Sequence, residues 1–473
     1  MTRLLLALMA AGLSAQEIPL FTKDFPPEEF AARRKAVYEA IGPNAVAVLQ
    51  GAPAPAGYVR FRQTNEFYYL CGVEAPHAYL LLNGATKRAA LYLPHRDERA
   101  EATGGKVLSA EMAEEVRKLS GVESVGPPEQ LARDLARAGW PSRGARELYT
   151  PLAPAEGLAV SRDVGFGTNS EAYNDPWDGR PSREGRFVQL LRERYPQFEV
   201  KDLSPVLDRL RLIKSEREIT LIEKATKLAG LSMIEGMRST APGQSEHELD
   251  GVAKFIYFRN GAQGEAYNSL VASGQNAWYP HYSAGKRRMD SGDLVLMDFA
   301  PDVGYYMSDV TRQWPVNGKF SAWQRELYGF YVACYEEMLK AIRPGVPVKQ
   351  IKQESGEAMG KILAGMTFSK PEYEKAAKRF VAAWQMSPGL GHSVGMATHD
   401  VGSLGDELKP GMVFTIEPAL TVPEEKIYIR LEDLIVVTEK GIRAPSGFVP
   451  RSIEAVEAEM KKPGLLKTYP RVD

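Results

Sequence analysis

Four acidic residues in the second half of the chain are spaced as two pairs that hairpins could bring together. Asp298 and Asp309 lie on either side of a turn-like sequence centred between Val303 and Gly304. The apolar run before Asp298 is typical of a strand, so the spacing predicts a β-hairpin in which the two aspartates face each other. Like charges on directly opposed residues, with Cβ atoms roughly 5 Å apart, repel. A divalent cation between them would remove the repulsion, although aspartates at hairpin ends are more often simply hydrated.

Glu417 and Glu432 form the second pair. The segment 427–432 alternates between apolar and polar residues, which is typical of a strand and places Arg430 and Glu432 on the same face. The intervening turn is centred between residues 424 and 425, so the two glutamates are also expected to oppose each other, unless Pro418 introduces a bulge and shifts the register. A second opposed acidic pair makes the hydrated alternative less attractive.

Histidine is scarce, with six residues in the chain. His281, His392 and His399 lie in glycine-rich or turn-like sequence of the second half, whereas a structural role is expected for His77, His95 and His247. Glycines flank His392, at positions 389, 391 and 395, and would let backbone approach a site closely. Four carboxylates and one imidazole form a ligand set that favours Mn²⁺, with Fe²⁺, Co²⁺ and Zn²⁺ as alternatives.

Four negative charges would neutralise two divalent ions. Such a pair of ions would lower the pKa of a bridging water and supply hydroxide near neutral pH. The remaining histidines and Arg430 could then stabilise an oxyanion or hold the substrate.

The 473 residues give room for two or three domains, and the balanced charge, net −1, gives no sign of a nucleic-acid partner. Residues 1–15 resemble a secretory signal peptide, so we expect a secreted or periplasmic protein; if this stretch is instead an ordinary N-terminus, the protein would be cytoplasmic. No later apolar run approaches the roughly 20 residues that a membrane span needs. Cys71 and Cys334 lie far apart, and two buried free thiols are favoured over a disulfide.

Residues 22–205 are expected to form one α/β domain. A helix is predicted over 26–41, and strands over 45–49, 79–82 and 89–93. The aromatic segment 65–70 also favours a strand, and helices are expected near 110–119 and 128–138. The Pro-, Gly- and Asn-rich region 141–186 is interpreted as an inserted surface loop. This half holds no cluster of ligand-type residues and is expected to serve as a scaffold, a specificity wall or an oligomer contact.

The second half carries a weak internal repeat. A long helix at 216–237 is followed by Pro-Gly and a second helix, and the same order recurs after a long helix at 321–342. Each pair of helices leads into strand-rich sequence. This order predicts a pseudo-twofold α+β domain with a cleft between its halves.

Four stretches resemble the metal-binding motifs of the pita-bread metallopeptidases, a group that includes methionine aminopeptidase, prolidase and aminopeptidase P. They are GDLVLMDFAPDVGYYMSDVTR, GLGHSVGMATHDVG, FTIEPAL and IRLEDLIVV, and the resemblance covers residues 212–455. RQTNEFYYLCGVEAP and LYLPHRDERAE resemble the creatinase-type domain that precedes the catalytic domain in aminopeptidase P and prolidase. Phe299 and Ala300 depart from the small residue and glycine usual after the first aspartate, and Ser393 stands where glycine is frequent.

The resemblance implies a role for each residue. Asp298 would contact one metal ion, Asp309 and Glu432 would contact both, and His392 and Glu417 would complete the set. His281 and His399 resemble the substrate-contacting and transition-state-stabilising histidines, and Arg430 resembles an arginine that supports the site. Glu417 or the hydroxide would handle the proton during attack on the peptide carbonyl.

The implied activity is release of the N-terminal residue from peptides with proline second, by a homo-oligomer, either a dimer or a tetramer. LYLPHRDERAE and the tail PRSIEAVEAEM look more like aminopeptidase P than prolidase. A dipeptidase acting on Xaa-Pro remains the alternative enzyme. A non-catalytic pita-bread module that binds peptides or partner proteins is a further alternative, which the retention of all five ligand positions disfavours.

Overall fold

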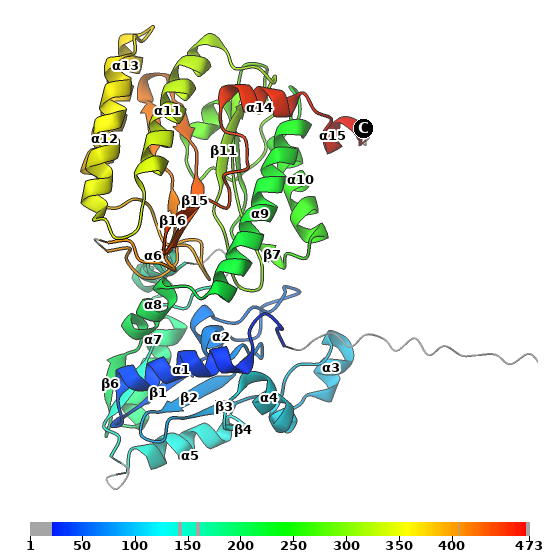
Figure 1. Ribbon diagram of the computed structural model, residues 1–473. Helices are drawn as coiled ribbons and strands as arrows, with labels where there is room; N and C mark the ends of the chain where they lie inside the picture. The colour runs from blue at the N-terminus through cyan, green and yellow to red at the C-terminus, as the bar shows by residue number, and fades with distance from the viewer. Residues whose placement is uncertain (1–20, 141–143, 158–160, 406, 470–473) are drawn as a thin grey trace, which may run out of the picture.

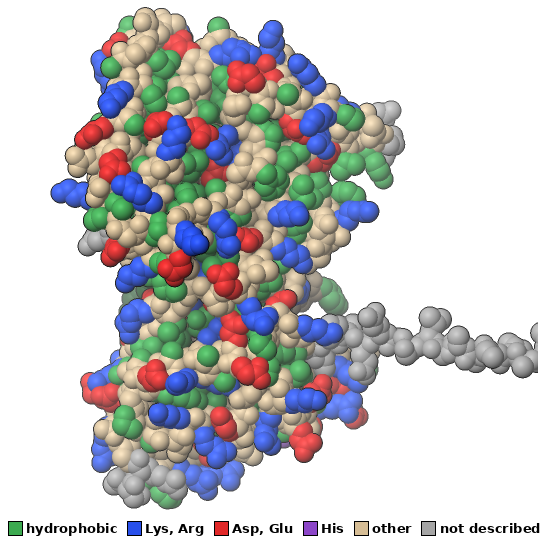
Figure 2. Space-filling view, viewed as in Figure 1, with side chains coloured by type: hydrophobic (Ala, Val, Ile, Leu, Met, Phe, Trp, Pro, Cys, Tyr) green, Lys and Arg blue, Asp and Glu red, His purple; other side chains and the backbone are tan. Residues whose placement is uncertain are grey.

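The computed structural model describes residues 21–140, 144–157, 161–405 and 407–469. An N-terminal body and a larger C-terminal body stack end to end, with α6 (Arg162–Asn174) and α8 (Ser204–Leu212) near their junction (Figure 1). Positive and negative side chains are interspersed over the face in Figure 2. Residues 1–15, which carry the predicted signal peptide, lie outside the described residues. Within the described part of the chain, no helix has the length and apolar character needed to cross a membrane.

The N-terminal body is built on a six-stranded mixed sheet with the order β4-β3-β2-β1-β5-β6. β1 and β2 pair antiparallel, as do β2 and β3, whereas the outer pairs β3–β4, β1–β5 and β5–β6 are parallel. The strands are β1 (Ala45–Gln50), β2 (Tyr79–Asn83), β3 (Arg88–Tyr92), β4 (Ser124–Gly126), β5 (Glu147–Thr150) and β6 (Glu199–Asp202).

Helices cover both faces of this sheet because successive side chains of a buried strand point to opposite faces. Ala47 and Leu49 pack on the face of α1, whereas Val46 and Val48 belong to a separate apolar cluster with residues of α5 and α7. The helices of this body are α1 (Pro27–Ile41), α2 (Asn65–Cys71), α3 (Glu98–Gly104), α4 (Ala113–Ser120), α5 (Glu129–Ala138) and α7 (Arg183–Arg194), together with α6 and α8. Cys71 and, in the other body, Cys334 are buried free thiols, as predicted.

Two predictions for this body are wrong. Residues 65–70 form the helix α2 and not a strand: all of them except Glu66 are buried, and Gly72 ends the helix in a left-handed conformation. Burial on several sides has overridden the strand preference of the aromatic residues. The region 141–186 is not merely a surface loop, because it contributes the sheet strand β5 and the helix α6.

The C-terminal body contains the predicted repetition of two helices followed by strands. α9 (Glu216–Ser239) packs on α10 (Glu246–Arg259), and α11 (Ala322–Ala341) packs on α12 (Val348–Ala364). Capping boxes start α9, α10 and α11, at Ser215, Ser245 and Ser321, where each serine and the glutamate or glutamine three residues later satisfy free backbone N–H groups. The remaining helices are α13 (Pro371–Met386), α14 (Ile453–Met460) and α15 (Leu465–Thr468).

The strands of this body lie between the two helix pairs (Figure 1). One sheet has the order β11-β9-β8 and another the order β12-β15-β16, while β10–β7 and β13–β14 form two-stranded ribbons. An isolated bridge between Thr311 and Glu432 joins the two halves. The strands are β7 (Gly264–Glu265), β8 (Leu270–Ser273), β9 (Leu294–Asp298), β10 (Pro301–Asp302), β11 (Thr311–Pro315), β12 (Val413–Ile416), β13 (Ala419–Val422), β14 (Ile427–Arg430), β15 (Asp433–Thr438) and β16 (Gly441–Arg443).

The register of the first hairpin differs from the prediction. Asp298 pairs with Thr311 and not with Asp309, so the turn is centred between Gly304 and Tyr305. The segment joining β9 to β11 is not a plain hairpin loop, because β10 within it pairs with β7. The displacement is two residues, and a period of two keeps a side chain on the same face of a strand. Asp309 therefore remains a neighbour of Asp298.

The register of the second hairpin is as predicted. Ile416 pairs with Asp433, and Ala419 pairs with Arg430, so both ladders share one centre between residues 424 and 425. Glu417 and Glu432 occupy the facing positions between these ladders. Pro418 interrupts the hydrogen bonding there without shifting the register.

The turn of the first hairpin is inserted into the N-terminal body. Tyr305 has a positive φ of 74°, and its ring stacks on Tyr68 with centroids 3.5 Å apart. Its hydroxyl donates to Glu74 at 2.7 Å and accepts from the backbone N–H of Gln63 at 2.8 Å. The guanidinium of Arg62 lies 4.4 Å from the ring centroid. The segment that carries Asp298 and Asp309 is thus held from both bodies.

Candidate metal centre

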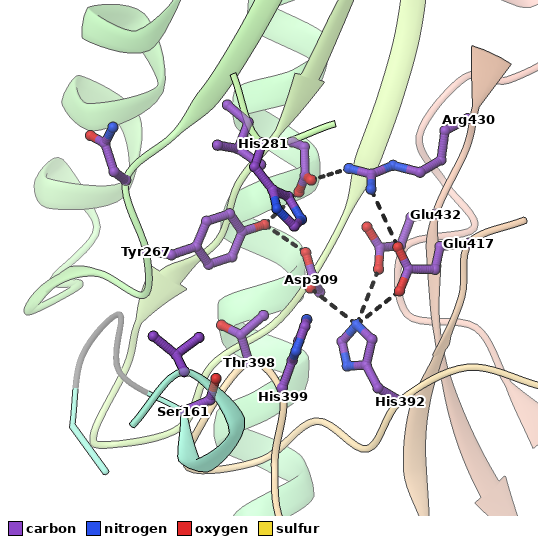
Figure 3. Close-up of a pocket in the computed structure, with 14 residues that line it drawn as sticks. Ser161, Tyr267, His281, Asp309, His392, Thr398, His399, Glu417, Arg430 and Glu432 are labelled. Atoms are coloured by element: carbon purple, nitrogen blue, oxygen red, sulfur yellow. Dashed lines mark hydrogen bonds and ion pairs between the residues drawn. The ribbon is translucent and has the colours of Figure 1, made fainter. Parts of the chain in front are cut away.

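All eight residues predicted for the site line one cavity of about 220 Å³. They are His281, Asp298, Asp309, His392, His399, Glu417, Arg430 and Glu432. This volume is below the roughly 300 Å³ at which pockets for drug-sized ligands begin, so the cavity has room for a small group or for one end of a longer molecule. Figure 3 shows the acidic side chains converging on His392, with His281 and His399 approaching from opposite sides in this view.

His392 is the centre of the cluster. Its Nε2 lies 3.1 Å from Glu417 Oε1, 3.6 Å from Asp309 Oδ2 and 3.8 Å from Glu432 Oε1. Its Nδ1 lies 3.3 Å from the carbonyl oxygen of Ser393, and because a carbonyl only accepts, Nδ1 is the donor. Nε2 is thereby turned toward the carboxylates, the orientation that a metal-ligating imidazole needs.

The backbone around His392 approaches its neighbours as the flanking glycines predict. A Cβ atom on Gly391 would overlap the carbonyl oxygen of Thr415, and one on Gly395 would overlap the carboxylate of Asp400. Gly389 has no comparable constraint, since its nearest neighbour would be 3.8 Å away. Two of the three glycines therefore allow the close packing that places His392.

The two aspartates share a hydrogen-bond donor. The Tyr267 hydroxyl lies 2.5 Å from Oδ1 of both Asp298 and Asp309, although its single hydrogen can serve only one at a time. Burial, followed by the charge of Asp298, raises the pKa of Tyr267, so this hydroxyl stays protonated. Burial and then the charge of Asp298 also raise the pKa of Asp309 well above its usual value.

Glu432 is almost fully buried, at 1% exposure, and only one of its oxygens is satisfied. Oε2 accepts from Thr311 Oγ1 at 2.8 Å, whereas Oε1, on the side of His392, has no hydrogen-bond partner. Burial, followed by the charges of Asp309 and Glu417, raises the pKa of Glu432. A buried carboxylate oxygen without a donor, beside other carboxylates, fits a cation ligand.

Arg430 links the remaining carboxylates. Its guanidinium pairs with Asp298 and lies 3.4 Å from Glu417 Oε2. Burial raises the pKa of Glu417, but the hydrogen bond and charge of His392, with the charge of Arg430, lower it overall. Burial likewise lowers the pKa of His392, and the contacts with Glu417 and Asp309 raise it to about 9.

Three residues can supply one ligand atom each within 4.8 Å of one another, namely Asp309, His392 and Glu432. This group can hold a metal ion. Asp298 is adjacent to the group because it shares the Tyr267 hydroxyl with Asp309, and Glu417 is adjacent because it contacts His392. Arg430 pairs with both Asp298 and Glu417. The donor set is rich in carboxylate oxygen with one imidazole, which suits divalent first-row metals.

Residues that the sequence reasoning missed complete the pocket. Tyr267 and Thr311 bond the acidic side chains, and Ser161, Val164, Asn268, Leu270 and Thr398 line the same cavity. Thr311 could have been suspected, since it lies two residues after Asp309, and side chains two residues apart in an extended segment point to the same side. Ser161, the N-cap of α6, and Val164, within α6, come from the N-terminal body, so this half forms part of the cavity wall.

Comparison with known proteins places the chain in a family. Residues 220–439 match metallopeptidase family M24, and residues 30–143 match the aminopeptidase P N-terminal domain. The protein therefore belongs to the M24 metallopeptidases, and within them to the aminopeptidase P family. The expected fold, a creatinase-type α/β domain followed by a pita-bread α+β domain, is confirmed.

The similarity to individual relatives covers nearly the whole chain. Xaa-Pro aminopeptidase of Escherichia coli strain K12 is 31% identical over 454 residues, which cover 92% of this chain and 97% of the relative. The structure of aminopeptidase P from E. coli with the inhibitor Pro-Leu superposes with a TM-score of 0.74 at 28% identity, covering 92% of this chain and 98% of that one. Xaa-Pro dipeptidase of Homo sapiens is 25% identical and covers 93% of this chain and 94% of the relative.

Proposed function

We propose that the protein is a metal-dependent exopeptidase that removes the N-terminal residue from peptides with proline at the second position. The observation that carries the proposal is the convergence of three carboxylates on His392, with an unsatisfied buried oxygen on Glu432. Its similarity over nearly the full length to Xaa-Pro aminopeptidases supports the substrate class.

We assign two divalent metal ions to Asp298, Asp309, His392, Glu417 and Glu432. Mn²⁺ is favoured by the oxygen-rich donor set, with Co²⁺, Zn²⁺ and Fe²⁺ as alternatives. When bound, such ions supply Lewis-acid chemistry: they polarise a carbonyl oxygen and lower the pKa of a water. The fit rests on the mutual distances around His392 and on the crowding of negative charge, which cations would neutralise.

The residues of the chain have distinct parts in this reaction. Glu417 has a lowered pKa, so it is ionised at neutral pH and can accept a proton. Arg430 fixes Asp298 and Glu417 by charge-assisted hydrogen bonds. His281 and His399 line the cavity beside the carboxylates, where they can contact the peptide and stabilise negative charge on its carbonyl oxygen.

An Xaa-Pro dipeptidase is the alternative, and the charges of the pocket disfavour it. A dipeptide would bring its free carboxylate into the cavity and would need a cation there. Among the described lining residues, Arg430 is the one Lys or Arg, and it is already paired with Asp298 and Glu417. A longer peptide keeps its C-terminal carboxylate outside.

The test is a peptide panel assayed after chelation and readdition of Mn²⁺, Co²⁺ or Zn²⁺ one at a time. A tripeptide with proline second should be cleaved, the matching Xaa-Pro dipeptide should be cleaved at least about tenfold more slowly, and a tripeptide with alanine second serves as the control. Faster cleavage of the dipeptide would favour the alternative enzyme. Undiminished activity in metal-free protein would overturn the mechanism, and absence of both activity and metal would favour a binding module.

Export and assembly are separate proposals. The signal-like sequence of residues 1–15 supports a secreted or periplasmic protein. N-terminal sequencing of the protein recovered from its native cell should then give a start near Gln16, and an intact Met1 would contradict export. Light scattering of the purified protein should give the mass of a dimer or tetramer, and a mass near 52 kDa would contradict assembly.

A further inference from the structure

An aspartate of the N-terminal body contacts the candidate catalytic centre. Asp163, in the first turn of α6, has its Oδ2 2.9 Å from Nδ1 of His399. The two residues are 236 positions apart in the sequence and come from different bodies. The C-terminal body is therefore not the only part of the protein that fixes the position of His399.

The carboxylate of Asp163 is itself fixed. Its Oδ1 accepts from Ser161 Oγ at 2.6 Å, and Ser161 is buried at the N-cap of α6. The first turn of a helix also favours a negative charge through the helix dipole. The acceptor that faces His399 thus comes from a short, locally bonded side chain on a regular helix.

A second connection joins the residues next to this pair. Arg162 lies 3.0 Å from Glu156, Glu156 lies 2.7 Å from Arg211, and Arg211 pairs with Asp400. These ion pairs lead from Arg162, next to Asp163 in the sequence, to Asp400, next to His399. The direct contact and the ion-pair path together form a closed ring.

This ring is largely buried on its far side. The side chains of Glu156, Arg211 and Asp400 are each 1% exposed, and Arg162 is further held by Glu66 at 2.7 Å and Asp208 at 2.6 Å. Buried charge pairs with several partners tolerate little movement, because separating them leaves an uncompensated charge. The N-terminus of α6 is therefore held at a fixed position relative to the 399–400 segment.

The chemical consequence concerns the two nitrogens of His399. A carboxylate only accepts, so Nδ1 of His399 carries the hydrogen and Nε2 is left for the pocket. The imidazole lies 4.2 Å from that of His392, between ring centroids, and Figure 3 shows it pointing toward the carboxylate cluster. A carboxylate behind a histidine fixes both tautomer and ring orientation in other enzyme sites.

We propose that Asp163 is a positioning residue, through which the N-terminal body sets the tautomer and orientation of His399 for the cleavage reaction. The inference rests on the proposed function, because it assigns His399 to the transition state of that reaction. Asp163 itself does not touch the substrate in this account and acts only through the imidazole.

The experiment compares steady-state kinetics of Asp163→Ala, Asp163→Asn, His399→Ala and the double variant Asp163→Ala/His399→Ala on a tripeptide with proline second. Glu171→Ala, an exposed position on the same helix, is the matched control. Loss of the outer partner of a metal-ligating histidine typically costs 10- to 100-fold. Because the Asp163–His399 contact is partly exposed, we expect kcat of Asp163→Ala to fall by about tenfold, the lower end of that range, with KM changed less than about twofold. Bound metal and melting temperature should match the wild type.

The double variant gives the decisive reading. If Asp163 acts only through His399, removing it from His399→Ala should cost nothing further, whereas independent effects would multiply. Asp163→Asn, which retains an acceptor oxygen without the charge, should fall between the wild type and Asp163→Ala. A kcat of Asp163→Ala within about twofold of the wild type, or multiplying effects in the double variant, would overturn the proposal. Failure of the wild type itself to cleave the peptide would instead refute the proposed function.

Discussion

Replacing Thr311 with valine should weaken metal binding without opening a cavity. Thr311 is fully buried, and its hydroxyl donates to Glu432 Oε2 at 2.8 Å and accepts from Arg430 at 3.2 Å. Valine has nearly the same shape but no hydroxyl, so the main change is the loss of these two hydrogen bonds. The carboxylate of Glu432 then loses the contact that fixes which oxygen faces His392.

The size of the effect follows from the type of hydrogen bond. A hydrogen bond to a charged group contributes about 1.5–3 kcal/mol, and each 1.4 kcal/mol corresponds to a factor of ten in a dissociation constant. We therefore expect the metal dissociation constant to rise roughly 10- to 100-fold. Because Thr311 is fully buried, no allowance for solvent screening is needed.

The assay is a titration of metal-stripped protein with Mn²⁺, followed by calorimetry or by recovery of peptidase activity. Thr311→Ser is the matched control, because it keeps the hydroxyl and should bind metal within about threefold of the wild type. Equal dissociation constants for Thr311→Val and the wild type would refute the argument that this hydroxyl orients Glu432. A loss of affinity in the serine variant as large as that in the valine variant would point to packing instead.

Three further predictions concern the site and the core beneath it. Asp309→Ala or Glu432→Ala should abolish turnover and lower bound metal together in elemental analysis, and a variant that keeps one of these while losing the other would contradict a shared metal site. Arg312→Met should lower the free energy of unfolding by roughly 3 kcal/mol in urea, because Asp433, fully buried and 2.6 Å away, loses its main partner; a change below about 1 kcal/mol would be contrary evidence. Burial raises the pKa of Asp433, but the charges of Arg312 and Arg451 lower it overall, so its contribution to stability is present above pH 4 or so and is lost as the pH falls through the folded-state pKa. Acid unfolding followed by circular dichroism should thus show a shallower slope for Asp433→Asn, and an unchanged slope would argue against this.

The sequence was informative wherever a repeating pattern determines the contacts. The spacing of Glu417 and Glu432 gave the correct register of their hairpin, since the ladders on both sides of Pro418 share one centre at the four-residue turn. The long helices at 216–237 and 321–342 were likewise predicted, and they appear as α9 and α11. In each case the determining interactions lie within a few residues or one turn of the chain.

The misplaced features depend on contacts with distant residues. The predicted pairing of Asp298 with Asp309 was wrong because β10, between them, pairs with β7, and Tyr305 packs against the N-terminal body. Residues 65–70 were predicted as a strand but form the helix α2, because their side chains are buried against several other elements. Asp163 was not identifiable as a site residue, since nothing in its local sequence indicates a contact with His399.

The insertion of Tyr305 bears on whether the two halves can be separated. A fragment beginning at α9 would retain every proposed ligand. In that fragment the ring of Tyr305, in the turn between Asp298 and Asp309, would be exposed to water and would lose its hydrogen bonds to the N-terminal body. Such a fragment would expose the surface that Tyr68, Glu74 and Arg62 now cover. The N-terminal body is therefore needed to hold the segment between Asp298 and Asp309 in its native conformation, and the C-terminal body alone would not keep it there.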